Sequence, residues 1–154
     1  MASVNIGRNR VTDKEILSIL QAMCEYSGNN INVIMGERIP PKRYLDKTNP
    51  HHFGLAVDFH MEGASDELAF QFIKGRYEGI FSRGYGYQLI WHGKYIAGQR
   101  PCLCLARFTQ SNLNTLICIK GGDRFENMDK YWMDDSLLIR WGRGSYVGHK
   151  LSYY

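Results

Sequence analysis

The stretch from His51 to His60 holds three of the chain's five histidines and one aspartate. Read with the period of two that a β-strand requires, it has one apolar face, and Asp58 and His60 lie on the other. Burying a carboxylate on such a strand is costly unless it is paired or bound to a metal. An imidazole and a carboxylate make half of a zinc site, which needs one more ligand and a water. The alternative is that the histidines are solvated and Asp58 pairs with a basic loop residue, Lys42, Arg43 or Lys47.

Three landmarks occur in order within residues 12–98. They are Val33-Ile34-Met35-Gly36-Glu37-Arg38, then His51-x-x-Gly54-x-Ala56-Val57-Asp58, then Trp91-His92-Gly93-Lys94-Tyr95-Ile96. Together they resemble the D-alanyl-D-alanine carboxypeptidase and dipeptidase family, zinc metallopeptidases that share their metal site with lysostaphin and with the hedgehog signalling domain. Three landmarks in the right order are far more specific than any one of them alone.

The resemblance implies a zinc site held by His51, Asp58 and His92, with the fourth position open as hydrolytic sites require. It also implies that Arg38 binds the anionic group of the substrate, because a guanidinium fork suits a terminal carboxylate. Asn49 stands where the family usually has a serine, and its amide can form similar local hydrogen bonds. The implied substrate is a peptidoglycan stem peptide, cleaved by a D-Ala-type carboxypeptidase or an endopeptidase.

One departure from the family pattern concerns the general base. The family carries an acidic residue three positions before the second histidine, and here that residue is Leu89, which cannot move a proton. If nothing replaces the base, Leu89→Glu is expected to raise the activity. Gln88 shares the face of His92 by strand parity and could orient a water, while His60 is the best-placed replacement base. Other candidates are His52, Glu62 and Glu78. The alternative is a catalytically silent module that binds zinc, wall peptides or a protein partner.

The cysteines allow a second alignment. If Gly84-Tyr85-Gly86-Tyr87 is matched to a similar segment of some relatives, the third ligand becomes Cys102 or Cys104. Four cysteines in a chain of this length do not form a compact disulfide framework. Buried, reduced thiols are the preferred interpretation, with a strand-to-strand bridge to Cys118 as the alternative.

Composition limits the classes of function. The 154 residues are 44% hydrophobic and 22% charged, as in ordinary globular domains, and the net charge of +4 favours anionic partners only mildly. A nucleic-acid partner is disfavoured because the basic residues form no run. The polar N-terminus has no signal-like apolar segment, and no stretch is long enough to cross a membrane. We therefore expect synthesis in the cytoplasm and action in the periplasm or cell wall after delivery, as for a phage lysin or a secreted effector. The sequence does not indicate an oligomeric state.

Local signals predict several elements. A capping box at Thr12–Glu15 begins a helix over 13–24 that ends at Ser27-Gly28-Asn29, followed by a strand over 31–35. A second helix begins after Ser65, with an apolar stripe of Leu68, Phe72, Ile73 and Ile80. The predicted strands are 85–91, a return strand through Ile96 after a turn at His92-Gly93, and a hairpin of 101–108 with 116–119. Residues 133–141 fit a helix or a strand equally well.

These elements predict an α+β fold of the hedgehog/DD-peptidase type. We expect a small, mostly antiparallel sheet, with two helices on one face and the metal site on the other. The chain is expected to be a single domain over 1–154, with a metallopeptidase-like core over 12–98. Residues 99–154 are then a C-terminal extension packed on that core, because their apolar runs are too long to be left in solvent.

Overall fold

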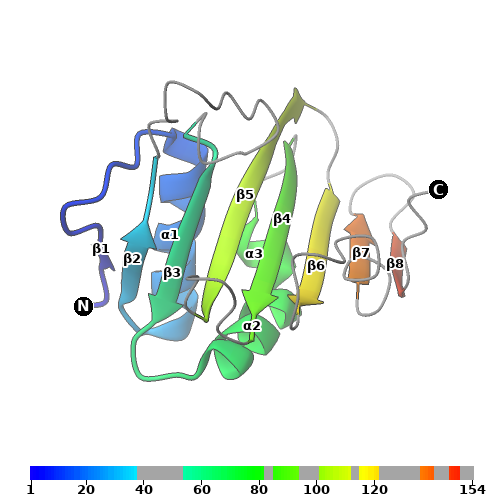
Figure 1. The fold of residues 1–154 in the computed structure, drawn as a ribbon. Coiled ribbons are helices and arrows are strands. Elements are labelled where there is room, and N and C mark those ends of the chain that lie inside the picture. The colour runs from blue at the N-terminus through cyan, green and yellow to red at the C-terminus, as the bar shows by residue number, and fades with distance from the viewer. Residues whose placement is uncertain are drawn as a thin grey trace.

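The computed structural model describes residues 1–37, 54–81, 85–93, 101–111, 115–121, 136–140 and 146–149. These residues form a mixed α+β fold, in which helices pack against one face of a continuous sheet (Figure 1). The helices are α1 (Lys14–Ser27), α2 (Asp66–Gly75) and α3 (Tyr77–Ile80). The strands are β1 (Val4–Asn5), β2 (Ile31–Met35), β3 (Ala56–Met61), β4 (Tyr85–His92), β5 (Cys102–Ser111), β6 (Thr115–Gly121), β7 (Ser136–Arg140) and β8 (Tyr146–His149). None of the helices in this part of the chain is long and apolar enough to span a membrane.

The sheet has the strand order β1-β2-β3-β5-β4-β6-β7-β8. Neighbouring strands are antiparallel except for β1 with β2 and β4 with β6, which are parallel. The prediction of an α+β fold with a mostly antiparallel sheet is therefore confirmed. With eight strands, the sheet is larger than the small one expected.

The predicted hairpin of 101–108 with 116–119 is wrong. Both segments are strands, but β4 lies between them: β5 pairs antiparallel with β4 on one side, and β6 pairs parallel with β4 on the other. The hairpin was predicted because the two segments are close in sequence. In the structure both of them pair with β4, whose two faces are buried. The same topology places β5 between β3 and β4, so the sheet does not divide into a 12–98 core and an added 99–154 segment. The ambiguous segment 133–141 contains strand β7.

Helix α1 forms where local signals predicted it. The Asp13 side chain caps the helix by accepting a hydrogen bond from the Ile16 amide at 3.0 Å. Gly28 ends it in a left-handed conformation (φ 73°), and its amide donates to the Cys24 carbonyl. The capping residue is Asp13 rather than Thr12, because the Thr12 amide and hydroxyl donate to Glu37 instead.

Helix α2 is capped by Ser65 as predicted, but its buried face differs from the predicted stripe. Leu68 is 65% exposed, and the residues facing the sheet are Ala69, Phe70 and Ile73. The helix ends at Gly75 and α3 begins at Tyr77, so a single stripe does not continue from Leu68 to Ile80. The rotation of α2 brings Phe70 against Trp91 of β4, with ring centroids 6.1 Å apart.

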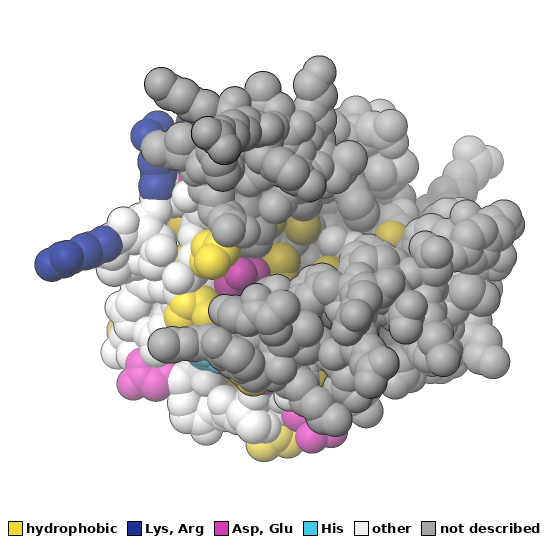
Figure 2. Space-filling view, in the orientation of Figure 1, with side chains coloured by type: hydrophobic (Ala, Val, Ile, Leu, Met, Phe, Trp, Pro, Cys, Tyr) yellow, Lys and Arg dark blue, Asp and Glu magenta, His cyan; other side chains and the backbone are white. Residues whose placement is uncertain are grey.

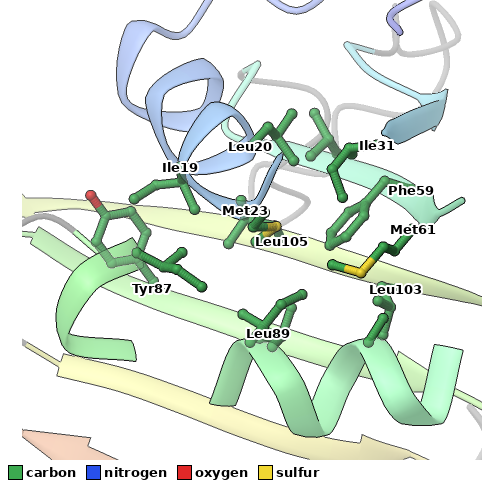
Figure 3. Packing of buried hydrophobic residues seen from close by; sticks show 14 of the residues in the cluster. Ile19, Leu20, Met23, Ile31, Phe59, Met61, Tyr87, Leu89, Leu103 and Leu105 are labelled. Atoms are coloured by element: carbon green, nitrogen blue, oxygen red, sulfur yellow. The ribbon is translucent and has the colours of Figure 1, made fainter. Parts of the chain in front are cut away.

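The two faces of the sheet have different contents. The helix face of β3, β4 and β5 carries large buried side chains, which pack with α1 into the main core (Figure 3). Its strand members include Phe59, Met61, Tyr87, Leu89, Leu103 and Leu105. The opposite face, here called the second face, holds a smaller buried cluster of Ala56, Ile90, Cys104, Ala106 and Ile119. Because side chains alternate along each strand, this second face also holds buried polar side chains, which include Asp58, Gln88 and His92.

An ion pair connects the start of α1 to β5. Arg107 donates to the Asp13 carboxylate from Nη2 at 2.6 Å and from Nε at 3.0 Å, and its guanidinium lies over the Tyr85 ring. Burial acts to raise the pKa of Asp13, but the hydrogen bonds from Arg107 and the Ile16 amide and the positive charge of Arg107 lower it overall. Asp13 therefore has two roles, as helix cap and as the anchor of Arg107.

We predict that Asp13→Asn lowers the free energy of unfolding by about 2 kcal/mol at pH 7, because asparagine still caps the helix but loses the bidentate ion pair. Asp13→Ala should cost about 1 kcal/mol more, since the cap is also lost. A carboxyl whose pKa is lowered by folding stabilises the fold above its unfolded pKa, and this contribution is lost as pH falls through the folded value. The gap between wild type and Asp13→Asn in urea unfolding should therefore shrink below about pH 4, and a gap that is constant with pH would contradict this account.

Candidate functional site

Asp58 is the central polar residue of the second face. It lies on β3, is 5% exposed, and pairs across the sheet with Met35 on β2 and Cys104 on β5. Strand alternation directs Val57 and Phe59 to the helix face, so the side chain of Asp58 points away from the helices. Figure 2 views the molecule from this side and shows acidic and hydrophobic side chains next to each other on this face. Asp58 thus lies on the face opposite the apolar residues of its strand, as the period of two predicted.

His92 and Gln88 lie on the same face as Asp58. Both belong to β4 and both are buried, at 7% and 8% exposure. His92 is opposite Cys102 of β5, and Gln88 is opposite Ala106. The parity argument that placed Gln88 with His92 agrees with this alternation.

One strand, β5, separates Asp58 from His92. Two strand spacings and an offset of two residues put their Cα atoms roughly 12 Å apart. An aspartate and a histidine can reach a common ion over that span only if both side chains are directed toward each other. Because Asp58 and His92 both lie on the second face, their side chains can point toward each other.

Cys104 is the cross-strand neighbour of Asp58 and is hydrogen-bonded to its carboxylate. Burial raises the pKa of the Cys104 thiol well above its ordinary value, and the negative charge of Asp58 and the hydrogen bond to it act in the same direction. Cys104, a ligand candidate of the second alignment, is thus a close neighbour of Asp58 on the second face.

All four cysteines are buried and free, which confirms the prediction of reduced thiols. Cys118 lies on the helix face with the main core, whereas Cys102 and Cys104 lie on the second face. The alternative bridge to Cys118 is therefore not formed. Burial raises the pKa of Cys118 to about 12.

Leu89 lies on the helix face, away from the candidate site. It is fully buried in the main core (Figure 3). By strand alternation His92 lies on the opposite side of β4. Residues three apart on a regular strand point to opposite faces. A glutamate at position 89 would therefore enter the hydrophobic core and not reach the metal site. The position of Leu89 therefore gives no support to the expectation that Leu89→Glu raises activity.

His60 is oriented by a carboxylate. Its Nδ1 lies 2.7 Å from Oδ1 of Asp66 at the start of α2, and its side chain is 40% exposed. By alternation it lies on the face of Asp58, two residues along β3. A partly exposed imidazole that is fixed by a carboxylate on one nitrogen has the arrangement of a general base.

The other base candidates within the described residues are engaged elsewhere. Glu62 accepts hydrogen bonds from the side-chain amides of Asn30 and Asn32. Glu78 lies on α3, on the helix side of the sheet, and accepts from the Tyr77 hydroxyl. Glu78 is thus on the other side of the sheet from Asp58, and Glu62 bonds Asn32, the cross-strand partner of His60.

Arg38, Asn49, His51 and His52 lie outside the described residues, as does the predicted return strand through Ile96. Two described residues near these positions contact each other: Glu37, which precedes Arg38, and Gly54, which lies three residues after His51. Gly54 adopts φ 72°, and a Cβ on it would lie 2.9 Å from Oε1 of Glu37. Glu37 also binds Thr12 and forms an ion pair with Arg10 at 3.1 Å. The chain therefore brings the residue before Arg38 next to the residue three after His51, and Glu37 is a contact that sequence reasoning missed.

The donor chemistry fits zinc as far as the described residues allow a test. A carboxylate and an imidazole on one sheet face are suitable ligands. Within the ranges that the structure describes, no three His, Cys, Asp or Glu side chains gather closely enough to hold a metal ion. The expected set of His51, Asp58 and His92 includes one residue outside those ranges.

Comparison with protein-family models, curated proteins and solved structures finds no match to the chain. The family resemblance is therefore carried by the three sequence landmarks alone.

We predict that Leu89→Glu lowers the free energy of unfolding by at least about 3 kcal/mol, because it places an acid in a fully buried apolar site. Leu89→Met is the matched control and should cost less than about 1.5 kcal/mol, since it conserves volume and polarity. Chemical denaturation followed by circular dichroism measures both. A stable Leu89→Glu protein with increased hydrolytic activity would contradict the assignment of Leu89 to the helix face.

Proposed function

We propose that the protein is a zinc-dependent peptidase that cleaves peptidoglycan stem peptides. The observation that carries the proposal is that Asp58 and His92, two of the three expected ligands, are buried polar residues on the same sheet face. Burying a carboxylate and an imidazole among alanine, cysteine and isoleucine side chains costs free energy that hydrogen bonds, charges or a metal ion must offset. Metal binding is the function that this donor set suits best.

The three ligands in this proposal are His51, Asp58 and His92. Bound zinc would supply a water of lowered pKa and a Lewis acid for the scissile carbonyl. Two neutral imidazoles and one carboxylate leave a net positive centre, which favours an anionic or strongly polarised substrate group. The buried position of Asp58 reduces competition from bulk water for its oxygens.

Arg38 is proposed to bind the terminal carboxylate of the stem peptide, with Asn49 in a supporting role. Support comes from the contact between Glu37 and Gly54, which joins the chain next to Arg38 to the chain that follows His51. Glu37 is held by Thr12 and Arg10, so it is fixed in place and its charge is shared with Arg10. Gln88 belongs to the same second face, where its amide is suited to orient a water or a substrate peptide group.

His60 is proposed as the general base in place of the family's acidic residue. Asp66 orients the ring through Nδ1, which leaves Nε2 to accept a proton from the attacking water and to pass it to the leaving amine. The partial exposure of His60 keeps it accessible to that water. Because Leu89 is buried in the core, the proposed base comes from a different strand position.

A catalytically silent zinc or wall-peptide binder is the second candidate. The burial of Leu89 in the core also favours this candidate. Without an acidic residue near the second histidine, the protein would keep its zinc ligands but lack the general base of the family. Activity measurements on zinc-loaded protein separate the two candidates.

The metal prediction is that purified protein carries close to one zinc per chain. His51→Ala, Asp58→Ala and His92→Ala should each lower the bound zinc to less than about a tenth, since each removes one of three ligands. His149→Ala, at the far edge of the sheet in β8, is the matched histidine control and should retain zinc. Elemental analysis after dialysis measures the content. Full zinc content in His92→Ala would overturn the ligand assignment.

The activity prediction is that zinc-loaded protein releases peptide fragments from purified muropeptides, detected by mass spectrometry. His60→Gln should reduce kcat by about 10²–10⁴-fold while zinc content is unchanged, because it removes proton transfer and leaves the ligands. Asp66→Asn should have a smaller effect in the same direction, since it weakens the orientation of His60. Zinc binding without any cleavage by wild type would instead support the silent binder.

A further inference from the structure

A network of side-chain amides joins three distant segments at the edge of the sheet formed by β1, β2 and β3 (Figure 1). Asn30 and Asn32 each donate from Nδ2 to Oε2 of Glu62, at 3.3 and 3.4 Å. The Asn30 side-chain oxygen accepts from the Ser3 amide at 2.9 Å. The Asn32 side-chain oxygen accepts from the Asn5 side chain, also at 2.9 Å. Each of the two amides is therefore held in one orientation, with its nitrogen directed at Glu62.

Backbone hydrogen bonds hold the same three segments together. The Glu62 amide donates to the Asn30 carbonyl at 2.9 Å, and the Ile31 amide donates to the Ser3 carbonyl at 3.1 Å. Strand pairing continues this connection, because β2 pairs with β1 on one side and with β3 on the other. The side chains of the network are thus carried by a frame that exists before any ligand binds, and such preorganisation lowers the cost of binding.

A pocket with a volume of about 410 Å³ lies beside this network. Its lining includes Gly28, Asn29, Asn30, Glu62 and Gly63. Small-ligand sites commonly have volumes of roughly 300–1,000 Å³, but most are lined by apolar side chains. Among the described residues that line this one, Glu62 has the only charged side chain, and amides supply most of the other polar groups. The pocket therefore suits a ligand with many polar groups.

The donors and acceptors of the pocket match hydroxyl groups. A hydroxyl both donates and accepts, and the Asn29 amide offers partners for both. Both network bonds go to Oε2 of Glu62, and Oε1 adds further acceptor capacity. Glu62 repels an anion, and the two amides that donate to it already stabilise its charge, which reduces the gain from a cation. We propose that the pocket binds a neutral, hydroxyl-rich saccharide.

This inference goes beyond the proposed peptidase function and uses none of the proposed zinc ligands. The test is a heteronuclear NMR titration of metal-free protein with tri-N-acetylchitotriose and, separately, with cellotriose. Binding should shift the side-chain amide signals of Asn29 and Asn30 and the backbone amide signal of Gly63. The side-chain amide of Asn9 is the internal control, because it donates to two backbone carbonyls and should not move. A response to either saccharide supports the inference, and no response to both at tens of millimolar overturns it.

Variants assign the binding to Glu62. Glu62→Ala should weaken saccharide binding about tenfold, because a hydrogen bond to a charged acceptor is lost. Glu62→Gln keeps an acceptor without the charge and should weaken binding about threefold. Glu78→Gln changes an exposed glutamate on the helix side of the sheet and should bind like wild type. Glu62 is exposed, so its variants should fold, and thermal unfolding checks this. Equal binding by wild type and folded Glu62→Ala would contradict the inference.

Ionic strength distinguishes a neutral ligand from a cation. Saccharide binding should be nearly the same at low and high salt, whereas an ion pair with an exposed carboxylate is screened. Butylammonium serves as the cationic probe. If it shifts the same signals at lower concentrations than the saccharides do, and high salt removes the effect, the pocket is a cation site and the inference is wrong.

The outcomes also separate this inference from the proposed function. Saccharide binding by zinc-free protein upholds the inference even if no peptidase activity is found. Peptidase activity in a protein whose Asn29, Asn30 and Gly63 signals do not respond to saccharides supports the proposed function and overturns the inference.

Discussion

The burial of the Asp58 carboxylate is the constraint that organises the second face of the sheet. An isolated ionised carboxylate in an apolar environment costs far more than a folded domain can supply, so Asp58 requires donors or a cation nearby. The cross-strand position is occupied by a thiol, Cys104, and the next positions on this face by alanines. Large side chains such as Phe59 and Leu105 are confined to the helix face.

Strand alternation explains both what agrees with the family pattern and what departs from it. On β4, His92 and Gln88 alternate with Leu89, so the first two share the face of Asp58 and the third enters the core. Because β4 is a regular strand through His92, a side chain three residues before His92 points to the opposite face and cannot act as a base at the site. The leucine is therefore a consequence of the packing of this strand, because the same position must fill space in the main core (Figure 3). In the proposed mechanism the proton is therefore transferred by a residue of another strand, His60 of β3.

Local chemistry made much of the fold predictable from sequence. Asp13 and Ser65 cap helices, Gly28 ends one, and the alternation over β3 assigns Asp58 to its face. The order of the strands was not predictable in this way, because it depends on which buried faces match across long sequence separations. The insertion of β5 between β3 and β4 is such a case, and so is the parallel pairing of β4 with β6. The exposure of Leu68 has the same origin, since the contact of Phe70 with Trp91 sets the rotation of α2.

The candidate site was predictable where spacing along one strand decided it, and not where contacts between distant segments did. Cys104 became relevant only through its register with Asp58, 46 residues earlier in the chain. Asp66 lies in the first turn of α2, where an acidic residue suits the helix dipole, and the structure adds its contact with His60. In each case the missing information was a cross-strand or strand-to-helix contact, which has no periodic signature in the sequence.

Residues 10–13 connect the framework of the sheet to the segments that carry the proposed site. The Arg10 carbonyl accepts from the Glu37 amide, Thr12 donates to the Glu37 side chain, and Asp13 holds Arg107 of β5. Glu37 in turn packs against Gly54, just before β3, and the Arg107 amide donates to the Leu55 carbonyl. One short segment thus links the end of β2, the start of β3 and the middle of β5. Because Asp58 and Cys104 lie on the last two of these strands, their register depends on contacts made on the far side of the sheet, at the N-terminus of α1.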